Sequence, residues 1–116
     1  MTAGAATLPR AARLSGKAQF DRVFAAGHRR GSRYFRLVVA DNGLDHPRLG
    51  MAVSRRIDRR AVVRNRLRRQ VREAFRLHWR DLPAIDVVVT ARPEAAHAPR
   101  AEVWADLLAL WKAQVR

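Results

Sequence analysis

A helical spacing of apolar residues runs through the most strongly basic part of the chain, residues 55–80. This stretch contains 11 arginines but only 2 acidic residues, Asp58 and Glu73. On a helical wheel of about 100° per residue, one sector contains Val63, Leu67, Val71, Ala74, Phe75 and His78. The spacing therefore predicts a helix from about residue 60 to residue 80, with one face packed on other elements and a wide arginine face.

The polar side of this predicted helix has few acidic partners. Only Glu73 lies within the helix, four residues after Arg69, so most of the arginines have no local ion pair. A row of like charges destabilises a helix by repulsion, and a polyanion that binds there would offset this effect. The whole chain has a net charge of +14, and 22 of its 24 basic residues are arginine, whose planar guanidinium binds phosphate with two hydrogen bonds. RNA is therefore the predicted partner.

The rest of the chain alternates between helical and strand-like patterns. Helices are expected over residues 15–26 and 100–115, and strands over residues 33–40, 48–54 and 85–91, with a short further strand near residues 31–32. The predicted order is α-β-β-β-α-β-α, an α/β (α+β) chain with one sheet and helices packed on it. Residues 1–12 are expected to form a mobile basic arm before a single domain over residues 13–116.

The composition excludes several classes of protein. The chain has no cysteine, which excludes disulfides and thiolate metal sites, and no apolar run approaches the roughly 20 residues that a membrane span needs. A cytoplasmic protein without a membrane partner is therefore expected. The four histidines share no motif, the acidic residues are scattered, and there is no glycine-rich phosphate loop. We therefore predict no catalytic side chain and no metal site in the protein itself.

Residues 61–69, Ala-Val-Val-Arg-Asn-Arg-Leu-Arg-Arg, together with residues 72–76, resemble the Arg-Asn-Arg signature helix of the protein subunit of bacterial ribonuclease P. The resemblance extends in order over most of the chain, because residues 13–24, 48–56 and 86–93 also resemble segments of that family. Residues 57–60 depart from it, since many members have a glycine-containing turn there.

The resemblance implies a two-layer α/β sandwich with a left-handed β-α-β crossover, in a protein that helps a catalytic RNA remove the 5′ leader of precursor tRNA. It implies that the RNA subunit contacts Arg64, Asn65, Arg66, Arg68, Arg69 and Arg72. A separate cleft for the single-stranded leader would involve Phe20, Phe24, Arg36 and Val38, to which strand alternation alone adds Tyr34. Catalysis and Mg²⁺ would then belong mainly to the RNA, and the protein is expected to be monomeric without it.

The aromatic residues of the predicted helices could either pack in the core or bind RNA bases. Phe20 and Phe24 are four residues apart on one predicted helix face, so they can line a trough together, although core packing is the more common role for each alone. Trp104 and Trp111 are seven residues apart, which favours sheet cover over base stacking.

Two other functions fit a basic helix on a small sheet. One is a structural RNA-binding protein of the ribosomal type, and the RNA that co-purifies with the chain would distinguish it. The other is a DNA-binding module, although helices that read bases usually carry a more mixed set of side chains than near-pure arginine. Preference for duplex DNA over structured RNA would favour that module.

Overall fold

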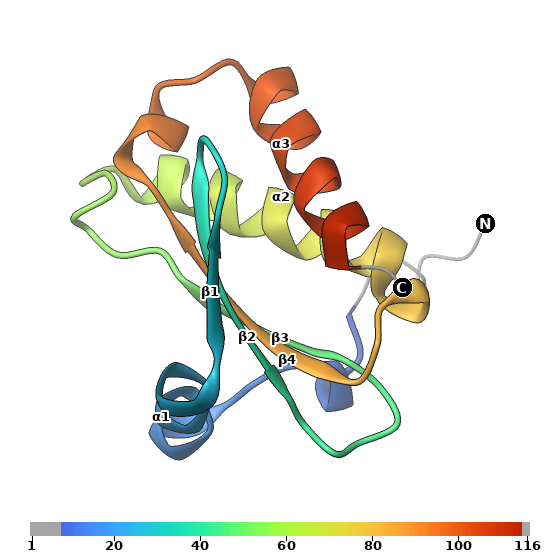
Figure 1. Cartoon of the computed structure of the whole chain (residues 1–116). Helices are drawn as coiled ribbons and strands as arrows, with labels where there is room; N and C mark the ends of the chain where they lie inside the picture. Colours follow the sequence, from blue (N-terminus) through green and yellow to red (C-terminus); the bar gives the residue numbers. More distant parts are fainter. Residues whose placement is uncertain (1–7, 115–116) are drawn as a thin grey trace.

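The computed structural model describes residues 8–114, and within them three helices and a four-stranded sheet make up the fold (Figure 1). In chain order the elements are α1 (Gly16–Ala26), β1 (His28–Gly31), β2 (Phe35–Asp41), β3 (Arg48–Ala52), α2 (Ala61–His78), β4 (Ile85–Ala91) and α3 (Arg100–Gln114). The predicted α-β-β-β-α-β-α order is therefore confirmed. None of these helices is long and apolar enough to cross a membrane.

The strands lie in the order β1-β2-β4-β3. β2 is antiparallel to both β1 and β4, whereas β3 is parallel to β4. Adjacent parallel strands need a crossover connection, and α2 provides it here. The left hand of this crossover stays a prediction from the resemblance.

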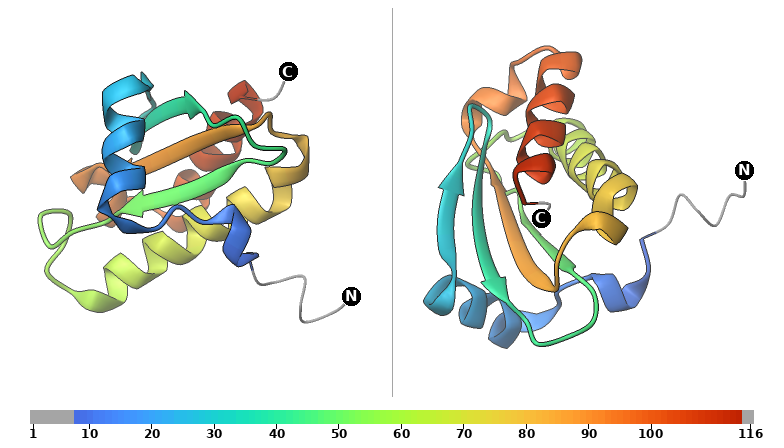
Figure 2. Two further views of the ribbon diagram at one scale, coloured as in Figure 1. Left: turned by 90° about the horizontal axis from the view of Figure 1, so that it is seen from below. Right: turned by 45° about the vertical axis from the view of Figure 1, so that its right-hand side comes forward.

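Helices cover both faces of the sheet (Figure 2). α2 and α3 pack on one face, where Val87 and Val89 of β4 join the larger core, and this sheet-and-helix pair is the predicted two-layer sandwich. α1 covers part of the opposite face, where Val23 packs with Val38 and Val88 in a smaller core. β4 is thus buried on both faces, as its nearly continuous β-branched run predicts.

The apolar sector of α2 forms much of the larger core. Val63, Leu67, Val71, Ala74 and Phe75 are all buried, which confirms the helical wheel for these five positions. Phe75 meets Trp111 of α3 edge to face, with ring centroids 5.5 Å apart and an interplanar angle of 70°. Trp111 is fully buried, so its predicted role as cover for the sheet is confirmed.

Residues 8–12 of the predicted mobile arm pack against the domain, and residues 1–7 lie outside the described residues. Leu8 is only 2% exposed and Ala12 is fully buried, because this segment packs beside β3. Arg13 makes a β-bridge with Leu49 and donates from Nη2 to the carbonyl oxygen of Leu8 over 2.8 Å. His46 also bonds the segment, through Nε2 to the carbonyl oxygen of Ala11 at 2.8 Å. The contacts with Leu49 and His46 join residues more than 30 positions apart, so they cannot be seen in the alanine-rich sequence.

β1 begins three residues before the position near residues 31–32 where a short extra strand was expected, and it follows directly after the glycine that ends α1. A Cβ atom on Gly27 would lie 2.5 Å from the carbonyl oxygen of Val23 and 2.5 Å from Cγ1 of Val38. Glycine is therefore needed at this position because the chain passes so close to both α1 and β2.

Candidate nucleic-acid interface

The turn before α2 is held by its own polar side chains. Asp58 Oδ1 accepts hydrogen bonds from the backbone nitrogen of Arg60 at 2.8 Å and from Arg60 Nε at 3.0 Å. These bonds from Arg60 lower the pKa of Asp58 to about 2. Residues 57–60, where the sequence departs from the resemblance, therefore form an ordered turn without glycine, fixed by this aspartate.

The arginines of α2 divide between its two edges, and the first edge faces β3. Arg68 donates from Nη2 to the carbonyl oxygen of Val53 at 2.7 Å and from Nη1 to Asn65 Oδ1 at 3.1 Å. Arg64 donates from Nη1 to the carbonyl oxygen of Arg59 at 2.7 Å. Neutral carbonyl groups orient these guanidinium groups without cancelling their charge, so the charge is still available to a phosphate.

The second edge of α2 faces α3. Arg66 donates from Nη2 to the carbonyl oxygen of Ala96 at 3.2 Å, and Arg69 is exposed beside it. The sequence spacing put Glu73 next to Arg69 on one helix face. In the structure Glu73 instead accepts a hydrogen bond from Arg76 Nε at 3.0 Å. This bond holds the pKa of Glu73 below its usual range. The one carboxylate within the helix therefore leaves Arg69 free to meet an outside anion.

A hollow of about 220 Å³ lies between α1, β3 and the first edge of α2, and we call it the β3 hollow. Phe20, Gly50, Arg68 and Arg72 are among its lining residues. The Phe20 ring lies against the backbone of Gly50, since a Cβ atom there would come within 2.7 Å of the ring atoms Cε1 and Cζ. The structure thus brings a predicted leader residue next to the predicted RNA-subunit row, which the sequence did not suggest.

A second hollow, of about 360 Å³, opens on the α1 side of the sheet, and we call it the β2 cleft. It gathers the predicted leader residues Phe24, Arg36 and Val38 with Arg29, Thr90 and Arg92. Phe24 is 39% exposed, which favours a binding role over the core packing that is more common for phenylalanine. Phe20 and Phe24 line different hollows, and the predicted common trough for the two rings stays a prediction.

Arg29 and Arg92 are the candidate site residues that sequence reasoning missed. Arg29 pairs with Val38 in the β1–β2 register, so it shares the face of the β2 cleft. Arg92 follows the last residue of β4 and donates its backbone N–H to the carbonyl oxygen of Tyr34 at 2.8 Å. All four residues of β1 are exposed and none is a large apolar residue, so no apolar alternation places the bounds of this strand or the face of Arg29.

Tyr34 is the predicted leader residue that the structure places on the other face of the sheet. It precedes β2, so strand alternation does not apply to it, and its side chain is buried in the larger core on the α3 side. Its backbone nitrogen donates to Asp106 Oδ2 at 3.1 Å, and its hydroxyl lies 3.5 Å from Glu102 Oε1. The prediction that Tyr34 shares the face of Arg36 and Val38 is therefore wrong.

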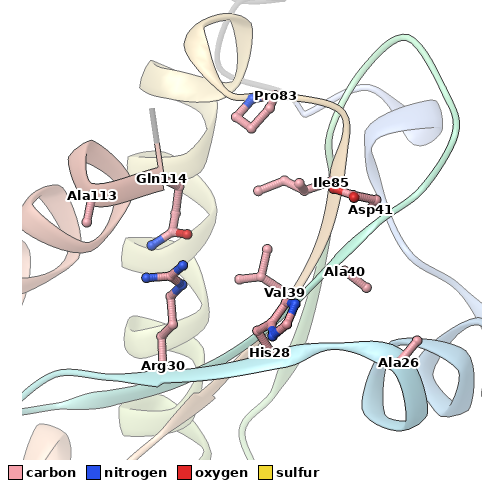
Figure 3. Close-up of a pocket in the computed structure, with 10 residues that line it drawn as sticks. All are labelled: Ala26, His28, Arg30, Val39, Ala40, Asp41, Pro83, Ile85, Ala113 and Gln114. Atoms are coloured by element: carbon pink, nitrogen blue, oxygen red, sulfur yellow. The ribbon is translucent and has the colours of Figure 1, made fainter. Parts of the chain in front are cut away.

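A further hollow of about 380 Å³ lies between the β1–β2 ribbon and the end of α3 (Figure 3). Arg30 of β1 extends toward Gln114 of α3, and His28 lies beside Val39 on the same side. The carboxylate residue Asp41 also lines this hollow, so its charges are mixed. Such a lining is a weaker match to a phosphate backbone than the arginines of the β2 cleft.

The sequence and the fold both match known proteins. The family model described as Ribonuclease P matches residues 8–114. The chain belongs to the ribonuclease P protein family. The ribonuclease P protein component of Coxiella burnetii is 42% identical over 92 residues, covering 79% of this chain and 76% of that protein. The Escherichia coli component is 38% identical over 108 residues, covering 93% and 91%.

Solved structures of the ribonuclease P family share the fold described above. The Staphylococcus aureus RNase P protein aligns with a TM-score of 0.84 at 33% identity, over 91% of this chain and 98% of that one. The Thermotoga maritima RNase P protein aligns with a TM-score of 0.77 at 33% identity, over 87% and 96%. Membership of this family, which acts in bacterial tRNA processing, decides against the ribosomal and DNA-binding alternatives. The chain is a protein subunit of an endoribonuclease.

Proposed function

We propose that this chain binds the catalytic RNA of ribonuclease P through α2 and positions the single-stranded 5′ leader of precursor tRNA in the β2 cleft. The observation that carries the proposal is the exposed Phe24 ring, which shares the cleft with Arg29, Arg36 and Arg92. Single strands are bound by aromatic faces for the bases and a cationic groove for the backbone, and the cleft offers both.

Arg64, Asn65, Arg66, Arg68, Arg69 and Arg72 are the proposed contacts to the RNA subunit. Arg64, Arg66 and Arg68 hydrogen-bond to backbone carbonyl groups, so their guanidinium groups are positioned while their charge is kept. Phosphates of a folded RNA would neutralise the repulsion between neighbouring arginines. Since the counterions of the RNA are released on binding, the affinity is expected to fall steeply with salt.

The leader and the RNA subunit would meet at α1. Phe20 lines the β3 hollow with Arg68 and Arg72, whereas Phe24, one helical turn later, lines the β2 cleft. The two hollows therefore flank one helix, α1, which supports a leader path from the RNA subunit toward Arg36. On this proposal Phe20 serves both partners, and Phe24 serves the leader alone.

Catalysis is proposed to belong to the RNA. Within residues 8–114 there is no group of three or more His, Asp or Glu side chains that could hold a metal ion. The buried carboxylate of Asp86 is engaged by Arg48 and Asn42 through hydrogen bonds of 2.7 to 3.0 Å. These residues do not fit a protein-held Mg²⁺. We propose that RNA phosphates hold the ion and that the protein lowers the Mg²⁺ requirement by neutralising charge.

The leader contact is tested with the reconstituted holoenzyme and two ligands, precursor tRNA with a leader and mature tRNA. Phe24→Ala is expected to weaken binding of the precursor by about fivefold or more, because a stacked base contributes roughly 1–3 kcal/mol, and to leave mature tRNA unchanged. Leu44→Ala is the matched control, since Leu44 is 42% exposed and lies in the β2–β3 loop. An equal loss for both tRNAs would contradict a leader site at Phe24.

A further inference from the structure

Another concave surface lies between α2 and α3, on the face of the sheet opposite the β2 cleft, and we call it the helix groove. Its main hollow has a volume of about 600 Å³ and is lined by Arg69, Gln70, Glu73, Arg100, Ala101 and Trp104. A second hollow of about 480 Å³ shares Arg69 and Arg100 and adds Val62, Asn65 and Arg66. The groove therefore continues into the residues of the Arg-Asn-Arg sequence.

We infer that the helix groove binds an unpaired nucleotide of a structured RNA, with the base against Trp104 and the phosphate between Arg69 and Arg100. The inference rests on the proposed function, to which it adds a base-binding contact. The β2 cleft and the helix groove lie on opposite faces of the sheet, so both can be occupied in one complex.

Trp104 differs from the other tryptophan of α3. Trp111 is fully buried and packs against Phe75, whereas Trp104 is partly exposed and lines the hollow. An indole with one side on the core and the other on a hollow is held rigidly for a stacked base. Both tryptophans were predicted to cover the sheet, but part of the Trp104 side chain is still available to a stacked base.

Gln70 gives the groove a polar group that the protein leaves unused. The residue is only 5% exposed, and its Nε2 donates to the carbonyl oxygen of Arg100 at 3.2 Å. Its Oε1 is buried and has no hydrogen-bond partner within residues 8–114. An unpaired buried acceptor destabilises a protein, and the N–H groups on the edge of a nucleobase are donors that would satisfy it.

The charges around the groove favour RNA over a protein partner. Arg66, Arg69 and Arg100 surround the two hollows, and the single acidic lining residue, Glu73, is already bonded to Arg76. Arg66 also has a buried Nε without a partner among the described residues. A base inserted between the helices would bring its phosphate to these cations, whereas an apolar helix would leave them without counter-charge.

Tryptophan fluorescence of the full chain tests this inference in a Trp79→Phe background. The catalytic RNA of a bacterial ribonuclease P and a leader-bearing precursor tRNA are titrated separately, so that the source of the nucleotide is identified. Because Trp111 is fully buried, quenching by either RNA reports on Trp104. Trp104→Leu is expected to weaken binding of the quenching RNA about tenfold with an unchanged salt dependence, and Trp104→Phe is expected to keep most of the affinity.

Arg69→Gln provides the complementary variant, because it removes a phosphate contact. It should weaken binding of the same RNA and lower the salt-dependence slope by about one.

The inference is overturned if Trp104→Leu folds with unchanged thermal stability and binds both RNAs as tightly as the parent chain. It is also overturned if Trp104→Leu abolishes self-association of the chain instead, since the groove would then bind a second copy. If Arg72→Gln loses RNA binding and Trp104→Leu does not, the inference about the helix groove is wrong. The proposed function would still hold in that case.

Discussion

Arg48 of β3 binds the buried carboxylate of Asp86 on β4 with two hydrogen bonds, Nε to Oδ1 at 2.8 Å and Nη2 to Oδ2 at 2.7 Å. Asn42, from the β2–β3 loop, donates to Oδ1 at 3.0 Å, and Arg22 of α1 also bonds this carboxylate. One fully buried aspartate therefore joins α1, the β2–β3 loop and both parallel strands. It fixes α1, which carries Phe20 and Phe24, to the sheet.

Loss of the arginine at position 48 should destabilise the fold. Arg48→Met leaves the Asp86 carboxylate buried without its two-pronged partner, and such a change typically lowers the free energy of unfolding by roughly 3–5 kcal/mol. Urea unfolding measures this loss. Arg55→Met is the control, because Arg55 is exposed in the turn before α2. Equal stability of the two variants would show that the Arg48–Asp86 pair contributes little.

The same carboxylate predicts how stability changes with pH. Burial raises the pKa of Asp86, but hydrogen bonds from Arg48 and Asn42 and the charges of Arg48 and Arg22 outweigh it, so the pKa is lowered overall. A carboxylate with a lowered folded-state pKa stabilises the fold above its unfolded pKa of about 3.9, and this contribution is lost as the pH falls through the folded-state value. Urea unfolding between pH 2 and pH 6 should therefore show a steeper acid loss for the parent chain than for Asp86→Asn. Parallel curves would contradict the role assigned to Asp86.

Arg72 offers a clean test of the RNA-binding row, because its side chain is exposed and lines the β3 hollow. Arg72→Gln should weaken binding of the catalytic RNA about fivefold, reduce the salt slope by about one and leave the melting temperature unchanged. Lys112→Gln removes the same charge from an exposed position on α3 and should have a much smaller effect. If both variants lose affinity equally, net charge and not the position on α2 determines binding.

Two glycines should respond differently to an added methyl group. At Gly50 a Cβ atom would meet the Phe20 ring at 2.7 Å, and at Gly27 it would meet the carbonyl oxygen of Val23 at 2.5 Å. A partly exposed ring can move, but the backbone of a helix cannot. Gly27→Ala should therefore lower the free energy of unfolding by about 1–3 kcal/mol, and Gly50→Ala should lower it by less. Gly50→Ala should still weaken RNA binding, since the displaced ring changes the β3 hollow. Thermal unfolding and RNA titration of both variants measure these effects, and a greater stability loss at Gly50 would contradict this assignment.

Periodicity predicted the elements that bury a regular face. The helical sector from Val63 to Phe75 and the β-branched run of β4 both lie where their patterns placed them. Local patterns carry this information because each residue of such an element meets the same core.

What the sequence could not predict depends on contacts between distant residues. Asp86 interrupts an apolar strand, and its partners Arg22 and Arg48 lie 64 and 38 residues away, so no local pattern connects them. Leu8 and Tyr34 are buried through contacts that follow from the fold, not from their neighbours in the chain. The arginines of α2 were predicted as one wide face, and only the positions of β3 and α3 divide them between two edges.

Cleavage of a leader-bearing precursor tRNA by a bacterial ribonuclease P RNA at low Mg²⁺, with and without this protein, tests the proposed function most directly. We expect leader removal at a single site that depends on adding the protein, no cleavage by the protein alone, and a higher protein requirement for Arg72→Gln. Cleavage by the RNA that the protein does not stimulate, despite tight binding, would contradict the proposed function. Cleavage by the protein alone would contradict the assignment of catalysis to the RNA.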